Sequence, residues 1–115
     1  MKNYFFLIFI LLLTACNKPS TIEIQNNLSK ASLKNIYWGE ISIAYEILPD
    51  ETSGKVKLYE DAQFNLDFPE EYPLRFYIEL NGIDVLVQTD EFYKLGNEDD
   101  LYIEINDTIK VSEIK

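Results

Sequence analysis

Residues 74–89 read LRFYIELNGIDVLVQT, and this stretch decides the fold. Apolar residues occupy every second position on both sides of Asn81-Gly82, which is the period of a strand with one buried face. Asn-Gly is the two-residue signal for a type I′ hairpin, since both residues tolerate a positive φ. The resulting register pairs Leu80 with Ile83, Ile78 with Val85 and Phe76 with Val87. All these apolar partners share one face, so we expect the hairpin at the centre of the core, with Ile78 and Val85 buried.

A second hairpin is predicted within residues 33–47. Gly39-Glu40 places glycine first, as a type II′ turn requires. That turn sets Trp38 opposite Ile41 and Ile36 opposite Ile43, with Trp38 as a core anchor. Further strands are predicted at 21–25, at 55–59 with Val56 and Leu58 inward, and at 63–68, where apolar and polar residues alternate.

The remaining segments divide into loops and short strands. Residues 69–73 contain two prolines, which disfavour regular pairing and predict a loop. Residues 91–95 are predicted as a short edge strand or a connector. Residues 101–105 and 109–111 alternate around a three-residue loop, which would pair Ile105 with Ile109 and Ile103 with Val111.

This pattern gives eight to ten short strands and no helix after residue 20. Short strands separated by frequent turns are typical of sandwiches and small barrels. We therefore expect one domain over residues 21–115. Its fold would be all-β, a small antiparallel β-sandwich of immunoglobulin-like or transthyretin-like architecture, with a small closed β-barrel as the alternative.

The N-terminus has a different character. Lys2 precedes an apolar run over residues 4–13, which is shorter than the roughly 20 residues that a membrane-spanning helix needs. The quartet Leu13-Thr14-Ala15-Cys16 resembles the lipobox of bacterial lipoproteins. The resemblance implies that residues 1–15 are a cleaved signal peptide and that Cys16 becomes a lipidated N-terminus. Residues 16–20 would then form a short tether to the membrane.

The same resemblance bears on location. In the enterobacterial sorting rule, Asp after the lipidated cysteine retains a lipoprotein in the inner membrane. Asn17 stands here instead, so we expect the outer membrane if the cell is Gram-negative. Whether the domain faces the periplasm or the cell surface stays open.

Composition limits the function. The chain has 20 acidic and 10 basic residues, for a formal charge of −10, and removal of Lys2 would make it −11. A chain this acidic lacks the basic patch that nucleic acid requires, and its charge favours a soluble monomer. It has no histidine, and its one cysteine is assigned to lipid. The usual general base, the Ser-His and Cys-His pairs and the commonest metal ligand are thereby absent, so we expect neither catalysis nor a cofactor.

Two groups of residues are candidate sites. The acidic turn Asn97, Glu98, Asp99 and Asp100 concentrates the oxygen ligands that calcium prefers, but it lacks the spacing of an EF-hand loop, and we expect a solvated turn. A possible interaction surface comprises Arg75, Tyr77 and Glu79 on the outward face of the main hairpin, together with Tyr102. Tyr37, Tyr59 and Tyr93 are further tyrosines that could be partly exposed, and tyrosine is enriched at binding surfaces. The triplet at residues 106–108 also matches the N-glycosylation motif, and residues 107–109 resemble a short O-glycosylation motif used on exported proteins in some Gram-negative lineages.

Two functions follow as hypotheses. The first is a non-catalytic lipoprotein that binds an envelope protein or glycan, or serves a structural role there. The second is an inhibitor of a basic hydrolase such as lysozyme, because the resemblance to small acidic lipid-anchored inhibitors extends to size and charge. A strongly acidic domain would be steered toward a basic target.

Overall fold

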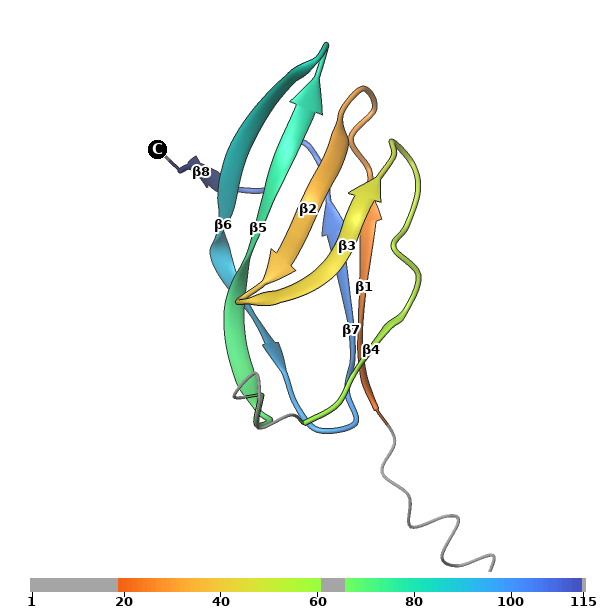
Figure 1. Cartoon of the computed structure of the whole chain (residues 1–115), viewed down its shortest axis with the longest axis vertical. Helices are drawn as coiled ribbons and strands as arrows, with labels where there is room; N and C mark the ends of the chain where they lie inside the picture. Colours follow the sequence, from red (N-terminus) through yellow and green to blue (C-terminus); the bar gives the residue numbers. More distant parts are fainter. Residues whose placement is uncertain (1–18, 61–65, 115) are drawn as a thin grey trace, which may run out of the picture.

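The computed structural model describes residues 19–60 and 66–114, and in these the chain is a β-sandwich of eight strands (Figure 1). The strands are β1 (Ser20–Asn26), β2 (Ser32–Trp38), β3 (Ile41–Ile47), β4 (Val56–Leu58), β5 (Glu70–Leu80), β6 (Ile83–Leu95), β7 (Asp100–Ile105) and β8 (Val111–Glu113). The described part contains no helix that is long and apolar enough to cross a membrane.

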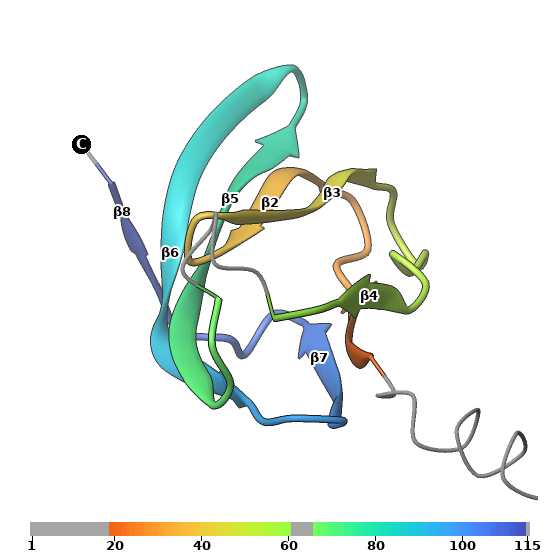
Figure 2. The same ribbon diagram turned by 60° about the horizontal axis from the view of Figure 1, so that its bottom comes forward.

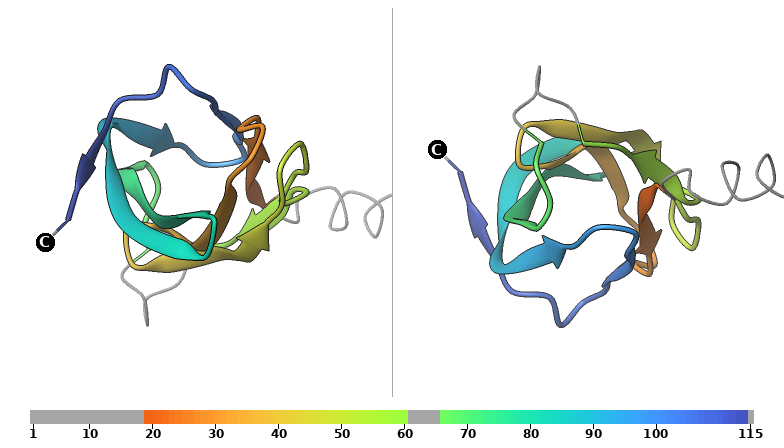
Figure 3. Two further views of the ribbon diagram at one scale, coloured as in Figure 1. Left: turned by 90° about the horizontal axis from the view of Figure 1, so that it is seen from above. Right: turned by 90° about the horizontal axis from the view of Figure 1, so that it is seen from below.

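The strands form two separate sheets. One has the order β4-β1-β7 and the other the order β3-β2-β5-β6-β8. Figure 2 shows the smaller sheet facing the larger one, and the end-on views of Figure 3 show the interior that they enclose. The predicted sandwich is confirmed, and the closed barrel is wrong. The expectation of wholly antiparallel pairing is also wrong, because β1 and β7 run parallel.

The β5–β6 hairpin has the predicted register. Leu80 pairs with Ile83, Ile78 with Val85 and Phe76 with Val87, and both turn residues have positive φ, 55° at Asn81 and 77° at Gly82. Burial along the hairpin differs from the prediction. Phe76 is fully buried and Ile78 only half-buried, while Val85, Leu80 and Ile83 are 37%, 44% and 66% exposed. The base of the hairpin therefore belongs to the core, and its tip projects beyond the sandwich.

The β2–β3 hairpin turns at Gly39, whose φ is 61°. Trp38 pairs with Ile41 as predicted, but Ile36 lies opposite Ala44 and not Ile43. The shift arises between Ile36 and Tyr37, where Ile43 is an extra residue on β3. A bulge adds one residue to a strand and displaces every later pair by one, so counting from the turn fails beyond it.

Trp38 is a core anchor, as predicted. Its side chain is fully buried, and its indole N–H donates to the carbonyl oxygen of Tyr93 at 2.9 Å. The ring of Tyr72 meets it edge-on, with centroids 5.1 Å apart and an interplanar angle of 80°. An aromatic pair in this geometry contributes beyond the area that it buries, and the indole leaves no unsatisfied donor in the core.

The loop predicted at residues 69–73 is largely strand. β5 begins at Glu70, and Pro73 pairs with Phe92. Residues 91–95, predicted as a short edge strand or a connector, are the C-terminal part of the long strand β6. Proline is tolerated because β2 pairs with β5 only from Leu74 onward, which leaves Pro73 with β6 as its one paired neighbour. A bulge follows it, where the Leu74 N–H donates to the buried hydroxyl of Thr89 at 3.0 Å.

The predicted C-terminal hairpin is wrong. β7 pairs with β1, so that Ile103 lies beside Ile24, and β8 pairs with β6 in the other sheet. The chain between them crosses the side of the sandwich, where the Asp90 N–H donates to the carbonyl oxygen of Lys110 at 2.9 Å. β7 and β8 each turn their apolar residues toward the core. The alternation of apolar and polar residues is therefore the same whether the two strands pair with each other or with other strands.

The three remaining strand predictions have different outcomes. β1 and β4 form where strands were expected at 21–25 and 55–59, with Leu58 buried and Val56 half-buried against the core. Half of the strand predicted at 63–68 lies outside the described residues. Leu66 is buried, and a bend with a cis peptide bond between Phe68 and Pro69 leads into β5.

Candidate functional site

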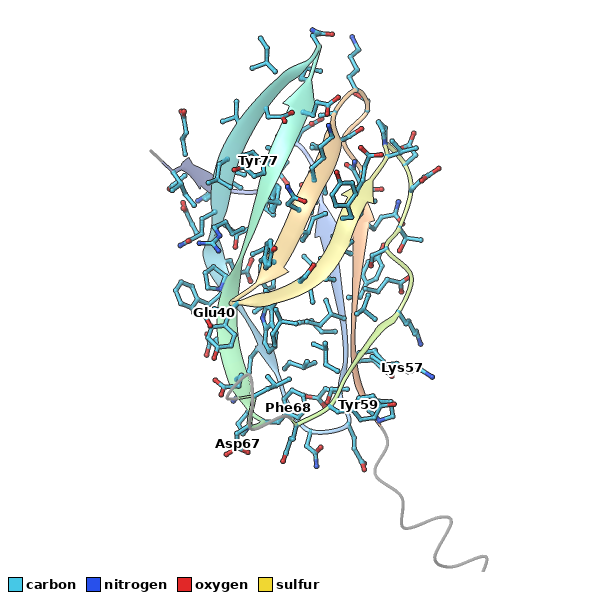
Figure 4. All side chains as sticks on the ribbon, in the orientation of Figure 1. Glu40, Lys57, Tyr59, Asp67, Phe68 and Tyr77 are labelled. Carbon is cyan, nitrogen blue, oxygen red and sulfur yellow. The ribbon has the colours of Figure 1, made fainter. Side chains whose placement is uncertain are left out.

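The outward face of the larger sheet carries the predicted interaction surface. Arg75 is exposed, and Tyr77 and Glu79 are half-buried at successive outward positions of β5. Figure 4 labels Tyr77 on this hairpin, far from Tyr59 and Phe68 at the opposite end of the molecule. Tyr102 does not join the group, because it lies on β7 of the other sheet, where it is 56% exposed. Its inclusion in the same surface is therefore wrong.

Strand pairing aligns a row of polar side chains across all five strands of this sheet. Tyr37 is paired with both Arg75 and Ser42, while Arg75 is paired with Gln88 and Gln88 with Ser112. From β3 to β8 the row reads Ser42, Tyr37, Arg75, Gln88, Ser112. With neighbouring strands about 4.8 Å apart, the row is roughly 19 Å long. It combines hydroxyl, phenol, guanidinium and amide groups and contains no carboxylate.

A groove lies along this row and along the neighbouring row that contains Tyr77 and Leu86. Its volume is about 390 Å³, and its lining residues are Asn35, Tyr37, Arg75, Tyr77 and Leu86. Cross-strand pairing places Leu86 beside Tyr77, and the bulge in β2 brings Asn35 to the rim. The two tyrosines and Leu86 supply apolar surface, whereas Asn35 and Arg75 supply hydrogen-bonding groups.

Arg75 is held against an aromatic ring. Its guanidinium carbon lies 5.9 Å from the centroid of the Tyr37 ring, within cation–π range. Glu79, four residues farther along the same strand, is paired with Lys34 across the β2–β5 ladder. Within the described part of the chain Arg75 forms no ion pair. The guanidinium is thus oriented by packing, and its N–H groups remain free for a ligand.

A second hollow lies at the side of the sandwich, next to the segment that joins β7 to β8. Its volume is about 530 Å³, and its lining includes the carboxylates of Asp90, Glu91 and Glu104, with Tyr93 and Lys110 beside them. Burial, and to a lesser degree the charge of Glu91, raise the pKa of the Tyr93 phenol. The hollow suits a cationic side chain better than an anion.

The acidic turn is engaged in local contacts. Asp99 accepts a hydrogen bond from the Gly96 N–H at 2.9 Å, and Asp100 accepts one from the Thr21 hydroxyl at 2.7 Å. Glu98 has a φ of 61°, and the side chains of Asn97 and Glu98 are exposed. In residues 19–60 and 66–114, no three His, Cys, Asp or Glu side chains are grouped so as to hold a metal ion.

The other predicted residues are scattered over the molecule. Cys16 lies outside the described residues. Tyr59 is exposed at the end of β4, and Tyr93 is half-buried in the second hollow. In the triplet at 106–108, the Thr108 hydroxyl donates to the Asn106 side-chain oxygen at 2.6 Å.

Sequence reasoning found part of the groove. Arg75 and Tyr77 follow from alternation along β5, and Leu86 follows from the register of the hairpin. Asn35 was missed, and Tyr37 was considered only as one of several tyrosines, because both reach the groove through the non-local pairing of β2 with β5. Alternation in β2 could have placed Tyr37 outward, but not beside Arg75.

Searches against protein-family models, curated proteins and solved structures find no match to this chain.

Proposed function

We propose that this protein is a lipid-anchored, non-catalytic domain of the bacterial envelope that binds glycans on the outward face of its five-stranded sheet. The observation that carries the proposal is the groove between Tyr37 and Tyr77. The anchor rests on Cys16, the only cysteine of the chain, at the end of the lipobox-like quartet.

The chemistry of the groove matches that of a sugar. An aromatic face carries partial negative charge and attracts the weakly positive C–H groups on one side of a sugar ring. Tyr37 and Tyr77 present such surfaces. Asn35, Gln88 and Arg75 carry donors and acceptors suited to sugar hydroxyls. A row of roughly 19 Å accommodates a short oligosaccharide lying across the strands.

The test compares tyrosines on the two sheets. Binding of envelope polysaccharide and its oligosaccharide fragments would be measured for wild type and for Tyr37→Ala, Tyr77→Ala and Tyr102→Ala. Removal of one stacking ring from the groove should weaken binding about two- to tenfold, if the contact resembles the aromatic pairs that contribute about 0.5–1.5 kcal/mol. Tyr102→Ala removes an exposed tyrosine of the opposite sheet and should bind like wild type. Equal losses in all three variants would contradict the proposal.

The second hollow favours another candidate function, inhibition of a basic hydrolase. Asp90, Glu91 and Glu104 line a space that can take a lysine or arginine side chain, and the acidic chain would steer a basic enzyme toward it. Lysozyme serves as the probe. Inhibition should weaken as salt rises and should fall in Glu91→Gln. Glu46→Gln replaces an exposed acid of β3, the edge strand of the five-stranded sheet opposite β8, and should inhibit like wild type. Full lysozyme activity with wild-type protein in excess would rule this function out.

A further inference from the structure

Arg75 is the only arginine of a chain that contains 20 acidic residues. Lys34 on β2 is paired with Glu79. Arg75 forms no ion pair in the described part of the chain, and among the described cations it is the one that lies against an aromatic ring.

The neighbours of Arg75 are uncharged or already paired. Its partners across the strands are Tyr37 and Gln88, both uncharged, and the carboxylate of Glu79 is neutralised by Lys34. The guanidinium carbon lies 5.9 Å from the centroid of the Tyr37 ring, within cation–π range. A cation–π contact does not consume the N–H donors of the guanidinium, and these form the fork that matches a carboxylate in a bidentate pair.

We infer that the groove recognises an acidic glycan, with Arg75 binding the carboxylate of a uronic or similar sugar acid. The inference rests on the proposed glycan-binding function and names its ligand class. A carboxylate at Arg75 would place the sugar ring that bears it beside Tyr37 and Tyr77, which line the same groove. A hydrogen bond with a charged group changes affinity by about tenfold or more, so one such pair suffices to separate acidic from neutral sugars.

The net charge of −10 does not oppose this contact strongly. The Debye length at physiological ionic strength is about 8 Å. Carboxylates farther away than that are largely screened, and Glu79 has its own counter-charge in Lys34. The ligand is therefore recognised at short range by one arginine, and not by the extended basic surface on which most polyanion binding depends.

The experiment uses the protein extracted from membranes in mild detergent and pairs of oligosaccharides that differ only in their carboxylates. Oligomers of galacturonate, glucuronate and sialic acid would be compared with their methyl esters by calorimetry. Wild type should bind the acid of at least one pair about tenfold or more tightly than its ester. Arg75→Gln should reduce this ratio below about twofold, and Arg75→Lys should restore only part of it, because an ammonium lacks the planar fork. Lys57→Gln, an exposed cation of β4 in the other sheet, should keep the ratio.

Each other outcome has a definite meaning. Equal binding of acid and ester, weakened by Tyr77→Ala, overturns the acidic ligand and keeps the glycan site. A ratio that survives in Arg75→Gln, when thermal melting shows that the variant is folded, overturns the role of Arg75. A sulfated oligomer without carboxylates that binds as tightly as the acid overturns the assignment to a sugar acid. Absence of binding in every pair overturns the proposed function together with the inference.

Discussion

Two turn glycines illustrate how single residues determine this fold. Gly39 and Gly82 both have positive φ, 61° and 77°, which costs other residues about 1–2 kcal/mol. Their surroundings differ. A Cβ on Gly39 would lie 2.8 Å from the Tyr72 ring, whereas a Cβ on Gly82 would have no heavy atom within 4 Å. Gly39→Ala should therefore destabilise the domain clearly more than Gly82→Ala in urea unfolding. Equal losses would show that the Tyr72 ring moves aside without cost.

Asn26 gives the second prediction at this scale. Its buried amide donates to the carbonyl oxygens of Ala31 and Ile47 at 2.9 and 3.0 Å, and its side-chain oxygen accepts from the Leu28 N–H at 3.0 Å. A buried group without its partner costs about 1–3 kcal/mol, so Asn26→Ala should lower the free energy of unfolding by about 2 kcal/mol or more. Asn27→Ala serves as the control, because its side chain bonds Glu104 at an exposed position, and it should cost less than 1 kcal/mol.

These residues also show what the sequence can predict. The Asn81-Gly82 turn was correct because its φ angles depend on the two residues themselves. Asn26 lies just beyond the strand predicted at 21–25, and its role could not be predicted because Ile47, which it holds, is 21 positions away. Neither its burial nor its role in joining β1 to the end of β3 has a local signal.

At the scale of elements, the β5–β6 hairpin predicts a gradient of stability. Phe76, at its base, is fully buried, whereas Leu80, near its tip, is 44% exposed. Phe76→Ala should destabilise the domain by about 3–5 kcal/mol, the usual cost of removing a buried phenylalanine. Leu80→Ala should cost less than about 1 kcal/mol, because much of its side chain is already in water. Similar costs at both positions would mean that the tip is covered in solution.

The same gradient explains why the hairpin was misplaced as the centre of the core. Alternation identifies which face of a strand is apolar, but not how far the opposing sheet extends along it. The opposing strands end at Asn26 and Ile105, so the upper half of the hairpin has no sheet to pack against. Strand partners could not be predicted for a related reason. β7 can bury its apolar face beside β1 as well as beside β8, and only its contacts with the distant β1 decide between the two pairings.

At the scale of the whole molecule, the candidate site depends on how the sheets assemble. Alternation grouped Arg75 with Tyr77 correctly, since they share one strand and one face. It also led to Tyr102 being placed in the same surface, because nothing local shows that β7 belongs to the other sheet. The residues of the β5–β6 hairpin that line the site could be predicted. Asn35 and Tyr37 could not, because they reach the site through the pairing of β2 with β5.

The last prediction concerns the orientation of the molecule on a membrane. If Cys16 carries lipid, the four residue steps to Ser20 span at most about 14 Å. β1 and β7 both begin at one end of the sandwich, and the β5–β6 tip lies at the other (Figure 1). β6 alone has 13 residues, which at about 3.3 Å each separates the tip from that end by roughly 40 Å. The turn at 96–99 should thus face the bilayer, and the hairpin tip should point away.

Two single-site labels test this orientation. Asn97 and Asp84 are exposed, and an acylated Cys16 offers no thiol, so Asn97→Cys and Asp84→Cys can each be labelled with one fluorophore. In vesicles with a nitroxide on the lipid headgroup, the label at position 97 should be quenched several-fold more strongly than the label at position 84, because such quenching acts only over short distances. Cys16→Ser in a chain without residues 1–15 should abolish membrane binding and with it the quenching, because neither the lipid nor the apolar run over residues 4–13 then remains. Stronger quenching at position 84 would place the exposed Leu80 and Ile83 in the bilayer, and membrane binding that persists without Cys16 would show that the lipid is not the anchor.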